Sequence, residues 1–121
     1  MFVINQNPII KWPVKVVLPA DGGVEQAAEL VAHIRLLPPE QYESLTKIES
    51  SETLSRALEQ GSAALSEFVA DWESVRDPQG EVVPYSPEAL RSALTGAGGN
   101  YVALAFWKAV HDVHLHGREK N

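Results

Sequence analysis

The chain has 121 residues, 45% hydrophobic and 21% charged, values that fit one soluble globular domain rather than a disordered chain or a coiled-coil rod. Sixteen acidic and ten basic residues give a formal net charge of −6, and the basic residues are scattered singly, so we expect no nucleic-acid partner. The lack of cysteine excludes disulfides and thiolate chemistry, and without a signal-peptide pattern or an apolar run of ~18 residues we expect no membrane partner.

Residues 11–37 predict an antiparallel β-hairpin. A period-two alternation, typical of a strand with one buried face, places four apolar side chains on one side: Trp12, Val14, Val16 and Leu18. Pro13 cannot donate a ladder hydrogen bond, which indicates either an edge strand or a position near the start of the strand. Residues 19–23, Pro-Ala-Asp-Gly-Gly, are typical of a tight reversal. Residues 24–37 fit both a strand and the i, i+3, i+4, i+7 spacing of a helix; the reversal before them favours the strand, and the helix stays open.

Residues 38–121 predict a mainly helical part. Pro39 can begin a short helix that continues through Leu45, and Ser50 or Ser51 can cap a longer one. Apolar residues three to four apart form the expected buried side of that longer helix: Leu54, Leu58, Leu65, Phe68, Val69 and Trp72. Gly61 interrupts the pattern and predicts a bend or a break, at a cost of ~1 kcal/mol relative to alanine.

The C-terminal third begins with irregular structure. Residues 77–80, Asp-Pro-Gln-Gly, predict a turn, and residues 81–85 are expected to be extended. Ser86-Pro87-Glu88 combines a capping hydroxyl, an early proline and a carboxylate near the positive end of the dipole, which predicts a helix start. That helix is expected to end at the glycine-rich residues 96–99.

A last helix is expected from about Asn100 to His116. Apolar residues surround most of its circumference, which indicates burial on several sides, within the chain or by a partner. The predicted fold class is therefore α+β: a mainly helical single domain, residues 1–121, with a small N-terminal antiparallel β-hairpin at 11–37 and a helical part at 38–121.

The histidines near the C-terminus are the first candidate for chemistry. His111 and His114 lie three residues apart beside Asp112, a combination found in metal sites. A helix C-terminus also favours histidine through its dipole, and no second constellation supplies a general base. We therefore favour an ordinary helix end and keep a small metal-dependent enzyme as an alternative.

Other catalytic patterns are weaker. No serine lies in a Gly-x-Ser-x-Gly elbow. Residues 95–100 could cradle a phosphate, but they lack the lysine of a P-loop and follow a helix instead of a strand, so a helix–helix connection is favoured. We expect no catalytic, cofactor-binding or metal-binding residues.

Two stretches carry motifs in a characteristic order. The first is Trp12-Pro13-Val14-Lys15-Val16, followed by the turn at 19–23 and by Arg35-Leu36-Leu37-Pro38. The second covers residues 69–80, with the pattern Trp-x-x-Val-x-Asp-x-x-Gly, and leads into Pro84-Tyr85-Ser86-Pro87-Glu88-Ala89-Leu90 at a helix start. In order and spacing, over most of residues 11–95, these motifs resemble the tail assembly chaperones of tailed bacteriophages.

The resemblance implies a non-enzymatic function in the cytoplasm of the bacterial host, with the protein absent from the mature virion. Such chaperones bind the tape measure protein and help to recruit tail-tube subunits, and some relatives also occur as a frameshifted longer form. A small acidic protein with an exposed apolar helix face could cover a long helical partner reversibly. Aromatic residues, which often anchor interfaces, gather in the C-terminal half. The expected contacts lie on the last helix: Val102, Phe106, Val110 and Val113.

Three alternatives to a chaperone remain. Another small phage structural protein, such as a head–tail connector or a tail completion protein, would stay in the virion. A homo-oligomeric scaffold would bury the apolar helix against its own copy. A metal-dependent enzyme would use His111, Asp112 and His114.

Overall fold

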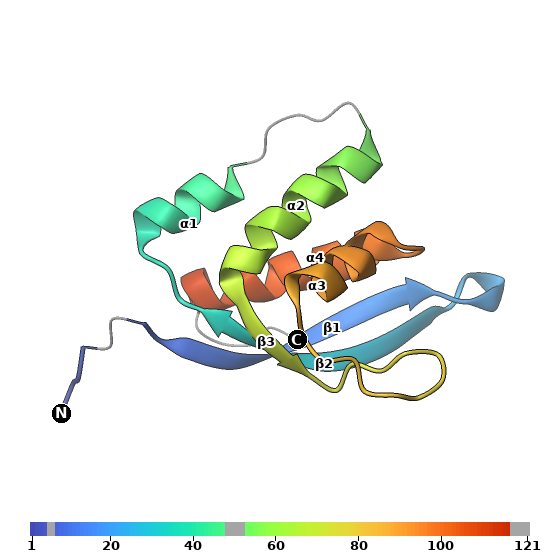
Figure 1. The fold of residues 1–121 in the computed structure, drawn as a ribbon, viewed down its shortest axis with the longest axis horizontal. Helices are drawn as coiled ribbons and strands as arrows, with labels where there is room; N and C mark the ends of the chain where they lie inside the picture. Colours follow the sequence, from blue (N-terminus) through green and yellow to red (C-terminus); the bar gives the residue numbers. More distant parts are fainter. Residues whose placement is uncertain (5–6, 48–52, 117–121) are drawn as a thin grey trace.

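The chain forms a layer of helices on one face of an antiparallel sheet (Figure 1). The computed structural model describes residues 1–4, 7–47 and 53–116. The strand order is β1-β2-β3, which makes β2 the central strand. The elements are, in chain order, β1 (Ile9–Pro19), the 3₁₀ turn η1 (Asp21–Gly23), β2 (Glu25–Arg35), α1 (Pro39–Thr46), α2 (Leu54–Phe68), β3 (Val69–Glu73), α3 (Pro87–Thr95), α4 (Gly99–His111) and the π-helical turn η2 (Asp112–His116). Within these residues no helix has both the length and the apolar character that a bilayer span requires.

The predicted N-terminal hairpin is confirmed. β1 and β2 pair without a register shift from Ile9 opposite Arg35 to Pro19 opposite Glu25. The segment that fitted both a strand and a helix is therefore a strand, because its pairing with β1 brings Ala32 and Ile34 into the core. β1 is an edge strand, as the proline in its middle indicated.

The prediction of one long helix from the fifties to the seventies is wrong beyond Phe68. α2 ends there, and Val69–Glu73 forms β3, which pairs with β2. The register shifts between His33 and Ile34, so β3 carries one extra residue at this point. This bulge places both Val69 and Trp72 on the buried face although they lie three residues apart. A bulged strand thus mimics the spacing of a helix.

The two ends of α2 are held by side chains. The predicted caps Ser50 and Ser51 lie outside the described residues, and the Thr53 hydroxyl accepts the backbone N–H of Arg56 at 3.2 Å. At the other end the Arg35 guanidinium lies 3.2 to 3.4 Å from the carbonyl oxygens of Ser66, Glu67 and Val69. A cation at the negative end of a helix dipole stabilises the helix-to-strand transition. The predicted break at Gly61 does not occur, because α2 runs continuously through it.

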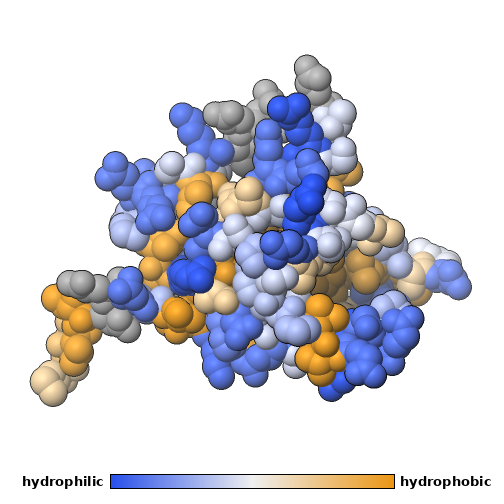
Figure 2. All heavy atoms as spheres, in the orientation of Figure 1, coloured by the Kyte–Doolittle hydropathy of each residue, from blue (hydrophilic) through white to orange (hydrophobic). Residues whose placement is uncertain are grey.

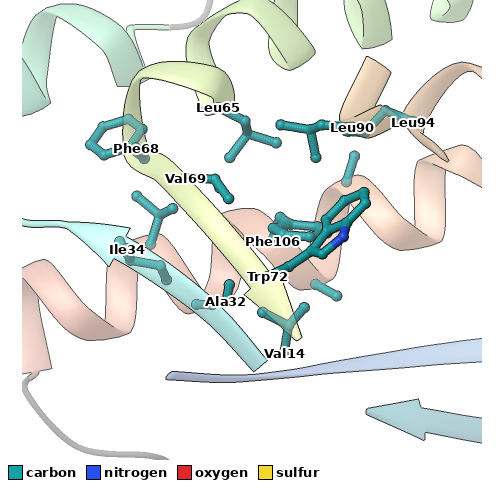
Figure 3. Close-up of a cluster of buried hydrophobic side chains, with 14 of the residues drawn as sticks. Val14, Ala32, Ile34, Leu65, Phe68, Val69, Trp72, Leu90, Leu94 and Phe106 are labelled. Atoms are coloured by element: carbon teal, nitrogen blue, oxygen red, sulfur yellow. The ribbon is translucent and has the colours of Figure 1, made fainter. Parts of the chain in front are cut away.

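The core lies between the sheet and the helices, and α4 passes through its centre (Figure 3). Figure 3 shows side chains from both layers meeting around Phe106. The predicted last helix is confirmed over Gly99–His111, and its final turn widens into η2. Phe106, Val110 and Val113, which we predicted as partner contacts, are 1%, 0% and 8% exposed. The chain's own sheet therefore supplies much of the cover that this apolar helix requires.

Several residues that carry the chaperone resemblance have structural roles. The Trp72 indole N–H donates to the carbonyl of Val83 at 2.8 Å, which fastens β3 to the segment before α3. The Asp77 carboxylate accepts two backbone N–H groups at 2.9 Å and builds the predicted turn. The Ser86 hydroxyl accepts the backbone N–H of Ala89 at 3.0 Å and caps α3 as predicted. In this molecule, these motif residues stabilise the fold.

Candidate functional site

An apolar groove lies among α1, α2 and α4. Its volume is about 740 Å³, within the range of ligand-binding pockets in proteins. The end of α1 contributes Leu45 and Thr46, and Lys47 follows at the rim. Figure 2 shows hydrophobic side chains gathered in the region between α1 and α2. This groove is the strongest candidate for a binding site in the described part of the chain.

The helices α2 and α4 form the two long walls of the groove. The α2 wall consists of Leu54, Ala57, Leu58, Gln60, Gly61 and Ala64. The α4 wall consists of Asn100, Ala103, Leu104, Trp107 and His111. Residues three and four apart share one helix face, so each wall is a nearly continuous stripe. Small residues on α2 face large ones on α4, and a Cβ atom added at Gly61 would lie 3.7 Å from the Trp107 indole nitrogen.

The groove exposes large apolar side chains to water. Leu54 is 64% exposed at the start of α2, and Leu104 is 68% exposed on α4. The described residues that line the groove include no carboxylate, although the whole chain carries a net charge of −6. A concave, mainly apolar surface between two helices suits an apolar segment of another polypeptide.

A cluster of aromatic rings supports one end of the groove. The buried Phe68 ring has edge contacts with Trp107, at 6.0 Å between centroids, and with His114, at 5.2 Å. The Tyr42 ring stacks on His114 at 4.7 Å, and His111 stacks on Trp107 at 5.9 Å. Such ring pairs add to the energy of burial and hold their members in fixed orientations. The Trp107 surface in the groove is therefore preorganised.

The two histidines in this cluster are held by hydrogen bonds. His114 Nδ1 donates to the carbonyl oxygen of Val110 at 2.8 Å, and its Nε2 accepts the backbone N–H of Leu37 at 3.1 Å. These partners require the neutral tautomer with the proton on Nδ1. The Tyr42 hydroxyl hydrogen-bonds to His111 Nδ1. The alternative of a metal site through His111, Asp112 and His114 would have to break these bonds.

Asp112 is also engaged. Its side chain is buried and accepts from Lys108 Nζ at 2.7 Å, one helical turn earlier. No group of three or more histidines and carboxylates within 1–4, 7–47 and 53–116 is arranged to hold a metal ion. The hydrogen bonds of His111 and His114 fix the end of α4 to α1 and to the segment that follows β2. These bonds support one side of the groove.

Burial shifts the titration of two groups in this cluster. Burial lowers the pKa of His111 from its ordinary value of 6.5, and the nearby His114 lowers it further, against an opposing effect of Asp112. Burial raises the pKa of the Tyr42 hydroxyl above its ordinary value of 10.0. Both shifts favour the neutral forms, which allow the Tyr42 hydroxyl to donate to an unprotonated imidazole nitrogen.

A pH dependence of stability follows from His111. Because its pKa is lower in the folded chain, the unfolded chain binds more protons as the pH falls below about 6.5. We expect the free energy of unfolding in urea to reach a plateau above that pH and to fall as the solution is acidified toward pH 5. His111→Gln should flatten this slope, whereas the exposed His116→Gln should leave it unchanged. Equal slopes in wild type and His111→Gln would contradict this assignment.

Of the predicted partner contacts, the structure brings none to the groove. Phe106, Val110 and Val113 are buried, and Val102 is partly buried against the core. The exposed face of the last helix is the neighbouring one, with Leu104 and Trp107. The small residues on α2 at Ala57, Gly61 and Ala64 form part of the opposite wall of the groove, and our prediction did not use their spacing.

The comparisons give no relative from which a function could be carried over. Neither the family models, nor the curated proteins, nor the solved structures contain a match to this chain. The groove and the motifs that resemble the tail chaperones are therefore the two features from which a function can be proposed.

Proposed function

We propose that this protein is a tail assembly chaperone of a bacteriophage or prophage, which binds other polypeptides and catalyses no reaction. Its expected partners are the tape measure protein and the tail-tube subunits, in the cytoplasm of the bacterial host and before the virion is complete. The single observation that carries the proposal is the exposed apolar groove among α1, α2 and α4. The order of motifs over residues 11–95 supports the same function.

The groove suits an amphipathic helix of the tape measure protein. Such a helix presents apolar side chains at i, i+3, i+4 and i+7, and a groove between two helices accepts that stripe. Leu54 and Leu104 already lie in water, so covering them removes apolar surface without unfolding the chaperone. The net charge of −6 would keep a partner that carries several copies in solution.

Co-expression with the tape measure protein of the same phage genome tests the proposal. The two proteins should co-purify, and Leu104→Asp should reduce the recovered complex at least tenfold, because it places a carboxylate in the groove. Leu54→Asp should reduce the recovered complex in the same way. The chain should stay folded, because a carboxylate at the first position of α2 is favourable for the helix.

The matched control is Val82→Asp. Val82 is 63% exposed, close to the 68% of Leu104, and lies between β3 and α3, outside the groove. This variant should co-purify like wild type. The proposal is wrong if no complex forms, or if both groove variants bind as well as Val82→Asp. Detection of the protein in purified virions would instead support a connector or a completion protein.

A further inference from the structure

The N-terminal arm, defined as residues 1–4, is a second exposed apolar feature. Met1 is fully exposed, and Phe2, Val3 and Ile4 are 86%, 74% and 78% exposed. The arm belongs to no helix or strand, and it projects from the body at the start of β1 (Figures 1 and 2). Four consecutive apolar side chains in water are unfavourable unless another surface covers them.

We propose that the N-terminal arm of one copy docks in the groove of a second copy, and that two copies exchange arms reciprocally. The proposal joins two apolar surfaces that the described residues expose, the arm and the groove. It goes beyond the chaperone function, because it assigns an occupant to the groove before any tail protein arrives.

The dimensions of arm and groove agree. Four extended residues span about 13 Å. The α2 wall extends from Leu54 to Ala64, a rise of ten residue steps and thus about 15 Å along the helix. In an extended peptide, alternate side chains point to the same side, so Phe2 and Ile4 would enter the groove together.

The charges of the two surfaces also agree. The first ten residues of the chain carry no charged side chain. Among the residues that the structure describes, the groove lining includes Lys47 and no carboxylate. Docking therefore brings the uncharged side chains of the arm against described lining residues that include no carboxylate, although each chain has a net charge of −6.

The attachment of the arm favours a second copy over its own groove. The Leu36 N–H donates to the Pro8 carbonyl at 3.0 Å, and Ile9 pairs with Arg35, so the chain after the arm is fixed to the end of the sheet. From this point the arm extends away from the helix layer (Figure 1). Reciprocal exchange gives a closed two-fold dimer in which both arms and both grooves are occupied.

Analytical ultracentrifugation of the full chain tests the exchange. Wild type should dimerise, and Phe2→Asp/Ile4→Asp should raise the dimer dissociation constant at least tenfold, as should Leu104→Asp. Val82→Asp should behave as wild type. The arm lies outside the fold and Leu104 is exposed, so these variants should remain folded, which circular dichroism checks.

Mixing the two defective variants gives the sharper result. The Phe2→Asp/Ile4→Asp chain retains a competent groove, and the Leu104→Asp chain retains a competent arm, so the mixture should form a heterodimer through one arm. A fluorescent peptide of residues 1–8 should bind the arm variant and not the Leu104→Asp variant. A monomeric wild type, a dimer that survives the arm substitutions, or a peptide that binds both variants alike would overturn the proposal.

If the protein is a tail chaperone, the arm and the tape measure protein would compete for one groove. Only this competition depends on the proposed function; the exchange of arms does not. The arm variant should therefore bind the tape measure protein at least as tightly as wild type. An arm-dependent dimer that ignores the tape measure protein refutes only the chaperone function. A complex with the tape measure protein, formed by a chain whose self-association does not depend on the arm, refutes only the exchange.

Discussion

Gly99→Ala should destabilise the protein by about 3 kcal/mol or more, because α3 and α4 meet at this residue without room for a side chain. A Cβ atom at Gly99 would lie 1.9 Å from the Leu94 carbonyl oxygen and 2.4 Å from its carbonyl carbon. Both are backbone atoms at the end of α3, so no rotation of a side chain can relieve the overlap. Urea unfolding of wild type and variant measures the difference.

Gly80→Ala is the matched control for Gly99→Ala. Gly80 has a φ of +83° and nothing within 4 Å of the added Cβ, so alanine there meets backbone strain but no overlap. The expected cost is about 1–2 kcal/mol. If Gly99→Ala cost no more than Gly80→Ala, the close approach of α3 to α4 would be wrong, and with it the position of the α4 wall of the groove.

Phe106→Ala should lower the free energy of unfolding by about 3–5 kcal/mol, because a ring that is 1% exposed would leave a cavity at the centre of the core. Leu104→Ala, two residues away on the same helix, should change it by less than about 0.5 kcal/mol, since Leu104 is 68% exposed. Thermal or urea unfolding of both variants gives the comparison.

Substitutions at Phe106 and Leu104 also distinguish an effect on folding from an effect on binding. Phe106 acts on a partner only through the fold, so a charged residue at this position would abolish binding by unfolding the chain. Leu104 should act on the partner with the fold intact. A stable Phe106→Ala variant together with an unstable Leu104→Ala variant would reverse the assignment of the two faces of α4.

The hairpin could be predicted because its signals are local. Alternating apolar residues and a Gly-Gly reversal fix the period and the turn before any tertiary contact is made. The third strand could not be predicted in this way. Its bulge opposite His33 and Ile34 restores the three-residue spacing of a helix, so Val69 and Trp72 have the same pattern in either structure.

The groove depends on information that a single helix does not contain. α4 is apolar nearly all round, and the sequence cannot say which side the sheet covers and which side stays open. The structure covers the side of Phe106 and Val110 and leaves Leu104 exposed. The helix cap at Ser86, in contrast, could be predicted from the sequence. Its hydroxyl accepts a backbone N–H only three residues away, so the neighbouring residues alone indicate the cap.

We propose that the groove among α1, α2 and α4 binds another polypeptide. Methyl NMR of the leucine- and valine-labelled protein, with and without the tape measure protein, tests it most directly. We expect the methyl signals of Leu54, Leu58 and Leu104 to shift or broaden while those of Val82 stay unchanged. Changes confined to Val82 and to Val17 on β1, with the three groove leucines unaffected, would contradict it.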